Sequence, residues 1–193
     1  TSALITYFQK AGLQAQALKP IISGFDEADM IASDTGQLLE AMNRPINLAE
    51  VKKISPWRFQ AALSPDMAAK RENKSLNLTE IIDFCHQEQA TTKADLTFIE
   101  GVGGIMVPLT DSETTLDWQV ALDTPCIVVI GSYLGTMSHC LTTLAALAER
   151  NITPLAIILN ESENSPVPLS ETATSIKPFI ADIPLIELAR GGD

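Results

Sequence analysis

The chain has 193 residues and a formal net charge of −11, a balance that argues against a general nucleic-acid or anionic-membrane surface. No apolar run approaches the ~18 residues of a membrane span, and no secretory signal is visible. Three cysteines in apolar or helical contexts favour a reduced, cytoplasmic setting over a disulfide framework. The length predicts one domain over residues 1–193.

The first half of the chain alternates apolar runs with helix-like segments. Residues 1–11 predict a helix that Gly12 ends, and residues 15–18 predict a strand followed by Lys19. Residues 20–33 look like a loop, after which Ser33 and Asp34 form an N-cap pair for a further helix. Residues 45–63 look irregular, and Ser64 precedes the next helix.

The second half continues the same alternation. Helices are predicted over residues 77–89, 114–122, 137–150 and 170–177, with a surface loop over 161–169. Strands are predicted over residues 96–99, 126–130, 155–159 and 179–183.

The apolar runs of four to six residues are typical of parallel strands buried on both faces. The predicted fold is therefore α/β, with a mostly parallel sheet and helices on both faces. Right-handed crossovers would bring Lys19, Glu100, Ser132 and Asn160 to one rim of this sheet, the edge at which ligands bind in such folds.

The segment over residues 98–104 (Phe-Ile-Glu-Gly-Val-Gly-Gly) places a carboxylate directly between a strand and a glycine-rich turn. Glycine lets the backbone approach a ligand closely, and a metal-bound phosphate would suit such a corner. On its own, the pattern fits an ordinary strand-to-loop turn equally well.

The chain starts at Thr1 with a helix already under way and no strand before it. We expect the natural protein to extend further at its amino end. A glycine-rich phosphate loop between a strand and a helix would lie in that preceding part.

Six segments together resemble the dethiobiotin synthetases in order and approximate spacing. They are residues 19–24 (Lys-Pro-Ile-Ile-Ser-Gly), 33–34 (Ser-Asp), 100–104 (Glu-Gly-Val-Gly-Gly), 108–111 (Pro-Leu-Thr-Asp), Asn160 and 183–184 (Ile-Pro). The resemblance implies a three-layer, P-loop ATPase-like nucleotide-binding domain that here lacks its first strand and P-loop. It also implies an enzyme that uses ATP and Mg²⁺ to join 7,8-diaminopelargonic acid and CO2 into dethiobiotin, through a carbamate and a carbamic–phosphoric anhydride.

The same resemblance implies roles for individual residues. Lys19 would be catalytic, as an ammonium between the carbamate and the triphosphate, and Asp34 and Glu100 would hold Mg²⁺. Substrate would contact Ser23, Gly103, Gly104 and, from the neighbouring subunit of a homodimer, Leu134, Gly135 and Thr136. The nucleotide would contact Glu100, Gly103, Asn160 and Pro184. Asp66 departs from the family, which commonly has histidine after Ser-Pro.

Other interpretations remain open on the sequence. Lys19 also fits a solvated lysine at a strand end, and Asp34 fits a plain helix cap. The chain could be another P-loop amidoligase, such as those acting on corrinoids, a regulatory or partition-type ATPase, or a truncated non-catalytic relative. His86 directly follows Cys85 on a predicted helix, and adjacent helix positions do not share a face, so this pair does not indicate a metal site. His139 fits a surface or interface position, and the neighbouring Cys140 fits the core.

Overall fold

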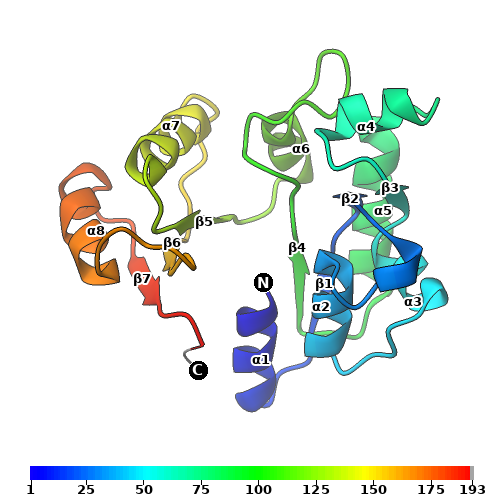
Figure 1. The fold of residues 1–193 in the computed structure, drawn as a ribbon, viewed down its shortest axis with the longest axis horizontal. Coiled ribbons are helices and arrows are strands. Elements are labelled where there is room, and N and C mark those ends of the chain that lie inside the picture. The colour runs from blue at the N-terminus through cyan, green and yellow to red at the C-terminus, as the bar shows by residue number, and fades with distance from the viewer. Residues whose placement is uncertain (192–193) are drawn as a thin grey trace. The chain divides into compact units, whose positions relative to one another are not determined.

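The structure is a computed structural model that describes residues 1–191. The chain divides into two compact units, Thr1–Leu122 and Asp123–Asp193. In each unit parallel strands alternate with helices (Figure 1), which confirms the predicted α/β class. Within the described residues, no helix is long and apolar enough to cross a bilayer.

The strands of the first unit form two parallel pairs. Strand β1 (Ala15–Leu18) pairs with β4 (Leu96–Ile99), and Leu18 lies opposite Ile99 in the register. Strand β2 (Ile21–Ser23) pairs with β3 (Trp57–Phe59). Because β1 and β4 run parallel and end in register, the residues that follow them emerge side by side.

Two helices of the first unit begin at polar caps in places where the sequence predicted a helix. The Ser33 hydroxyl accepts the Gly36 N–H at 3.0 Å at the start of α2, and Asn77 caps α5 in the same way. The helices are α1 (Ser2–Lys10), the 3₁₀ turn η1 (Glu27–Asp29), α2 (Asp34–Ala41), α3 (Leu48–Ile54), α4 (Pro65–Arg71), α5 (Leu78–Thr91) and α6 (Thr115–Leu122).

The core of this unit consists of two hydrophobic clusters. Helices α1, α2 and α3 bury Ile5, Leu39 and Ile54 against β1 in one cluster. Helices α4, α5 and α6 bury apolar side chains against β2 and β3 in the other. Ile99 of β4 packs against both clusters, so the end of β4, where the glycine-rich turn starts, lies between them.

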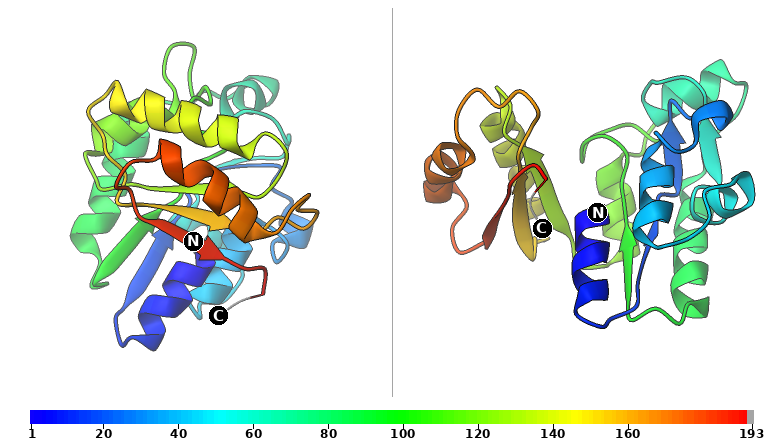
Figure 2. Two further views of the ribbon diagram at one scale, coloured as in Figure 1. Left: turned by 90° about the vertical axis from the view of Figure 1, so that its left-hand side faces the viewer. Right: turned by 60° about the horizontal axis from the view of Figure 1, so that its bottom comes forward.

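The second unit is one parallel sheet with the strand order β5–β6–β7. Figure 2 shows α7 and α8 on one face of it. Ile127 and Val129 of β5 are 37% and 59% exposed, unlike the predicted two-sided burial, whereas Val128 and Ile130 alternate with them and are buried. The elements are β5 (Ile127–Gly131), α7 (Thr136–Ala148), β6 (Ala156–Asn160), α8 (Leu169–Ile176), the 3₁₀ turn η2 (Lys177–Phe179) and β7 (Leu185–Leu188).

Three expectations about the elements were wrong. The predicted loop over residues 20–33 contains β2, and the irregular stretch over 45–63 contains α3 and β3, because Asn47 caps α3 by accepting the Glu50 N–H at 3.0 Å. The strand predicted over residues 179–183 is absent from the described structure: η2 ends at Phe179, Ala181 has a left-handed φ of 49°, and β7 starts only after Pro184. The single-domain organisation stays a prediction.

Candidate active site

Lys19 and Glu100 meet at the edge where β1 and β4 end. They directly follow Leu18 and Ile99, which are paired in the register. The Lys19 side chain is buried, with 5% of the residue exposed, and its ammonium donates to Glu100 Oε1 at 2.8 Å and to the Gly101 carbonyl at 2.8 Å. A buried cation is stabilised only when it is paired and hydrogen-bonded, so this is not the solvated lysine of the alternative interpretation.

Asp34 reaches the same ammonium from another element. It is the first residue of α2, and its Oδ2 lies 3.3 Å from Lys19 Nζ. Ser33, not Asp34, caps the helix. The Asp34 side chain is 61% exposed, so this carboxylate faces both the lysine and solvent. The plain helix-cap interpretation of Asp34 is therefore wrong.

The charge of Glu100 is set by two opposing effects. Burial raises the pKa of this carboxyl, but the charge and the hydrogen bond of Lys19, with a further hydrogen bond from the Thr1 side chain, bring the pKa below its usual value. Glu100 is therefore ionised at neutral pH, and the cluster of Lys19, Asp34 and Glu100 carries a net negative charge. Such a cluster favours a further cation.

The two carboxylates fit a magnesium ion better than a metal that prefers a cage of protein ligands. Mg²⁺ takes hard oxygen ligands, commonly one or two carboxylates, and keeps several waters. Asp34 and Glu100 offer that donor set around one ammonium. No group of three or more His, Cys, Asp or Glu side chains that could hold a metal occurs within residues 1–191.

Ser23 carries an unpaired buried hydroxyl at the end of β2. Its Oγ has no hydrogen-bond partner among the described residues, and leaving a buried hydroxyl unpaired costs roughly 1–3 kcal/mol. The following Gly24 has a φ of 72°, and a Cβ there would lie 3.2 Å from that of Ala62. A ligand group that bonds to Ser23 would satisfy this hydroxyl.

The glycine-rich turn after β4 uses its glycines differently. Gly103 has a φ of +64°, and a Cβ on it would lie 2.7 Å from Val107 Cγ2, so a side chain at this position is excluded twice over. Around a Cβ on Gly104, in contrast, the structure shows open space, so the backbone is accessible from that side.

In the second unit, Asn160 and the β5–α7 turn occupy one end of the sheet. Asn160 ends β6 and pairs in register with Gly131, the last residue of β5. In the turn that follows, Leu134 is 93% exposed and Gly135 has a φ of +100°. The buried Thr136 hydroxyl already donates to the Gly131 carbonyl at 2.5 Å, which leaves the exposed turn backbone as the part available to a substrate.

Pro184 does not join Asn160. Its carbonyl accepts the Ile157 N–H at 2.8 Å, and β6 and β7 are parallel with Ile157 opposite Leu185 and Asn160 opposite Leu188. Pro184 therefore lies at the start of these strands, four residues and about 13 Å from the level of Asn160 at roughly 3.3 Å per residue. The β6–β7 register therefore places Asn160 and Pro184, the two residues expected to contact adenine, at opposite ends of these strands.

Other residues occupy the places near the expected contacts. Thr1, to which the sequence assigned no role, hydrogen-bonds to Glu100. Beside Asn160, Glu161 donates its N–H to the Leu188 carbonyl at 2.9 Å and accepts the Arg190 N–H at 2.9 Å. The segment that meets Asn160 thus follows β7 instead of preceding it. The number of residues in the partner strand could have revealed this segment. In a parallel pair, a strand that starts beside the beginning of β6 reaches the level of Asn160 only at its far end.

The remaining singled-out residues have structural environments. Asp66 accepts a hydrogen bond from the Ser64 hydroxyl at 2.6 Å at the start of α4. His139 Nδ1 lies 2.9 Å from the Tyr133 hydroxyl. Cys85 is fully buried, and burial raises the pKa of its thiol to about 12. This thiol is therefore inert.

Comparison with known proteins agrees with this geometry. A family model described as an AAA domain matches residues 1–189. An ATP-dependent dethiobiotin synthetase from Caulobacter sp. (strain K31) is 40% identical over 189 residues, covering 98% of this chain and 80% of the relative. The chain belongs to the dethiobiotin synthetase family. A second dethiobiotin synthetase, from Phenylobacterium zucineum, is 38% identical over 98% of this chain and 81% of its own length.

A third relative, the ATP-dependent dethiobiotin synthetase of Methylobacterium nodulans, is 38% identical over 100% of this chain and 87% of its own length. Membership of this family confirms the predicted recognition, the P-loop NTPase-like fold class and an enzyme of the ligase class that forms carbon–nitrogen bonds. It also removes the corrinoid amidoligase and the partition-type ATPase as the leading alternatives.

Proposed function

We propose that this chain closes the cyclic urea of dethiobiotin from 7,8-diaminopelargonic acid, CO2 and ATP in biotin synthesis. The observation that carries the proposal is the buried Lys19 ammonium held between Asp34 and Glu100, in a chain whose relatives are named ATP-dependent dethiobiotin synthetases. One amine of the substrate takes up CO2 to give a carbamate. The carbamate oxygen then attacks the γ-phosphate and displaces ADP, and the second amine attacks the carbonyl carbon of the resulting mixed anhydride, releasing phosphate and a proton as the ring closes.

Lys19 supplies positive charge where two anions must approach. A carbamate and a triphosphate repel each other, and a preorganised ammonium in a water-poor site stabilises the charge that moves during phosphoryl transfer. The ammonium is already oriented by Glu100 and the Gly101 carbonyl. It therefore needs little rearrangement when the substrate arrives.

Asp34 and Glu100 would hold Mg²⁺, which would neutralise charge on the phosphate oxygens when bound. The low pKa of Glu100 keeps this ligand ionised. The exposed side of Asp34 leaves room for the waters that this metal retains. Of the two carboxylates, Glu100 would be held by its hydrogen bond to Lys19, and Asp34 would be placed by the first turn of α2, which carries it.

Ser23, Gly103 and Gly104 would contact the substrate. The unpaired Ser23 hydroxyl suits the substrate amine or its carbamate, and the open side of Gly104 suits a close backbone contact. Asn160 would bind adenine, because its amide both donates and accepts. Pro184 would act on the base only if the segment before β7 moved, so we assign that role instead to the backbone over residues 188–190, which lies beside Asn160.

A homodimer would complete the substrate site. The turn at Leu134, Gly135 and Thr136 would bind the carboxylate of the substrate that is held by the neighbouring subunit. The amino end of a helix favours an anion, and α7 begins at Thr136. We also place the enzyme in the cytoplasm. All three cysteines are free, as is typical of a reducing compartment.

The test is product formation by the protein as it is encoded, together with any residues that precede Thr1. Incubated with diaminopelargonate, bicarbonate, ATP and Mg²⁺, it should form one dethiobiotin, identified by mass spectrometry, for each phosphate released. Phosphate release that is independent of diaminopelargonate would refute the proposal in favour of another ATPase activity. A folded protein that releases no phosphate and forms no dethiobiotin would refute it in favour of a non-catalytic relative.

A further inference from the structure

Two buried hydroxyl groups meet one residue away from Asp34. Thr35 Oγ1 and Ser55 Oγ lie 2.7 Å apart, and both residues are 0% exposed. Thr35 stands in the first turn of α2, whereas Ser55 directly follows α3. The hydrogen bond therefore ties the turn that carries Asp34 to a segment 20 residues further along the chain.

The same segment also holds the backbone of Lys19. The Lys19 N–H donates to the carbonyl of Ile54 at 3.0 Å, and Ile54 precedes Ser55. One dipeptide thus contacts Lys19 through its carbonyl and the start of α2 through its hydroxyl. The distance between the Lys19 ammonium and the Asp34 carboxylate depends on this shared support.

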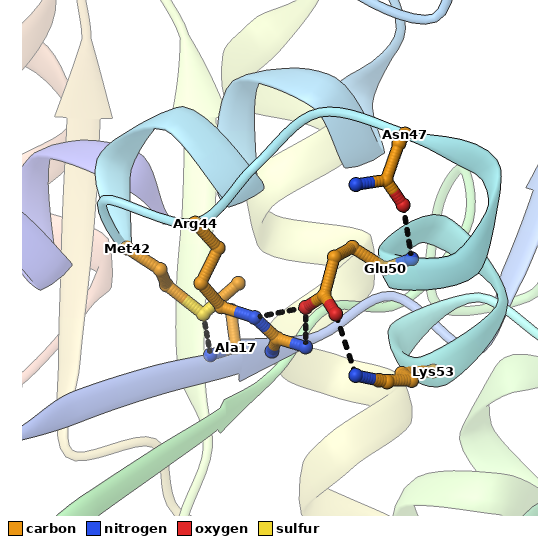
Figure 3. Close-up of polar contacts among 6 residues, drawn as sticks. All are labelled: Ala17, Met42, Arg44, Asn47, Glu50 and Lys53. Atoms are coloured by element: carbon orange, nitrogen blue, oxygen red, sulfur yellow. Dashed lines mark hydrogen bonds and ion pairs between the residues drawn. The ribbon is translucent and has the colours of Figure 1, made fainter.

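The support is itself fixed on the α3 side. Arg58 donates to the Pro56 carbonyl at 3.0 Å, just after Ser55. At the other end of α3, Figure 3 shows Glu50 accepting from Arg44 and Lys53 while Asn47 caps the helix. Since the Glu50 side chain is only 17% exposed, these bonds keep α3 in place.

The α2 side is also closely packed. A Cβ on Gly36 would lie 2.0 Å from the Met30 carbonyl, so the backbone of the first turn of α2 touches the segment before it. Asp34 itself is mostly exposed and has no such wall around its side chain. Its carboxylate is carried by the first turn and reaches the Lys19 ammonium at 3.3 Å, so a shift of that turn would move the carboxylate away from this distance.

We propose that Thr35 and Ser55 are positioning residues that hold the Asp34 carboxylate at its distance from Lys19 and so tune magnesium affinity. The inference rests on the proposed function of Asp34 as a metal ligand. Neither hydroxyl touches substrate or metal. Partners that orient a metal ligand change metal affinity by about 10–100-fold when they are removed, and because this pair acts through the helix backbone we expect about tenfold.

The experiment compares five variants with the unmodified protein. Thr35→Val and Ser55→Ala each leave one buried hydroxyl unpaired, and the double variant removes both. Thr35→Ser keeps the hydrogen bond. Thr97→Val serves as a matched control, because it removes a hydroxyl that bonds to Gln16 between β1 and β4 at 3.0 Å without touching α2.

The readouts are Mn²⁺ binding, followed by electron paramagnetic resonance with ADP present, and the urea midpoint of unfolding. Each single variant should lower the midpoint and weaken Mn²⁺ binding about tenfold. The double variant should recover most of the midpoint, because no hydroxyl stays unpaired, yet bind Mn²⁺ as weakly as the single variants. Thr35→Ser and Thr97→Val should bind Mn²⁺ like the unmodified protein.

Recovery of both stability and Mn²⁺ affinity in the double variant would overturn the inference and leave the pair a structural contact. Unchanged Mn²⁺ affinity in all variants would overturn it as well. The proposed function fails on a different result, namely an unmodified protein that makes no dethiobiotin. The two failures are thus distinguishable.

Discussion

Replacement of Lys19 by methionine removes the ammonium but keeps a long apolar side chain in the same buried place. Breaking a fully buried ion pair costs about 3–5 kcal/mol of unfolding free energy. Here the partners are not fully buried: the Asp34 side chain is 61% exposed and that of Glu100 is 29% exposed. Water can therefore solvate most of the charge left behind, and we expect a loss of about 1–3 kcal/mol.

The effect on the reaction should be larger than the effect on stability. Loss of a preorganised donor that faces developing charge lowers kcat by about 10²–10³-fold. Magnesium binding should be retained or tightened, because the ammonium no longer competes for the two carboxylates. This combination separates a missing catalytic charge from a collapsed metal site.

The assay is diaminopelargonate-dependent phosphate release, with urea unfolding and Mn²⁺ binding measured on the same preparations. Lys70→Met is the control: that side chain is 60% exposed and pairs with Asp111, itself 84% exposed, so its loss should change stability little and leave the rate unchanged. A folded Lys19→Met protein that releases phosphate at the normal rate would refute the catalytic role.

Three further outcomes follow from the same structure. Glu100 has a folded-state pKa below the reference value of 4.5, so its contribution to stability is present above that pH and is lost as the pH falls through the folded pKa. The unfolding free energies of the native protein and of Glu100→Gln should therefore converge as the pH is lowered below 4.5. A constant difference between them would contradict the pairing with Lys19. Met42→Leu removes the sulfur that accepts the buried Ala17 N–H at 3.1 Å (Figure 3). This change should lower the unfolding free energy by about 1–2 kcal/mol and speed amide exchange at Ala17. Unaltered exchange would show that the sulfur is not an effective acceptor. Asn160→Ala should raise the KM for ATP about tenfold with little change in kcat, as expected for lost hydrogen bonds to the base, and an unchanged KM would remove Asn160 from nucleotide binding.

Features that depend on local pattern were predictable from the sequence. The Ser33 cap and the amphipathic helix predicted from residue 77 are local features, and both helices are present. Lys19 and Glu100 could be placed together because each follows an apolar run, and the carboxyl ends of parallel strands share an edge. Their meeting at 2.8 Å needed only that β1 and β4 be neighbours.

Features that depend on register or on packing between distant segments were not predictable. The family resemblance implied that Asn160 and Pro184 both contact adenine, but only the β6–β7 register shows that they lie at opposite ends of these strands. Helix α3 was missed because its seven residues lie between prolines, too short a stretch for a clear period. The Thr35–Ser55 pair joins two small polar residues with no periodic signal, and only tertiary packing brings them to 2.7 Å.

The most direct measurement is a crystal structure of the natural protein with Mg²⁺, a non-hydrolysable ATP analogue and diaminopelargonate. The account predicts an octahedral metal about 2.0–2.1 Å from carboxylate oxygens of Asp34 and Glu100, with Lys19 Nζ facing the substrate amine or carbamate and the γ-phosphate. Density for the metal and both substrates away from these three side chains would contradict it.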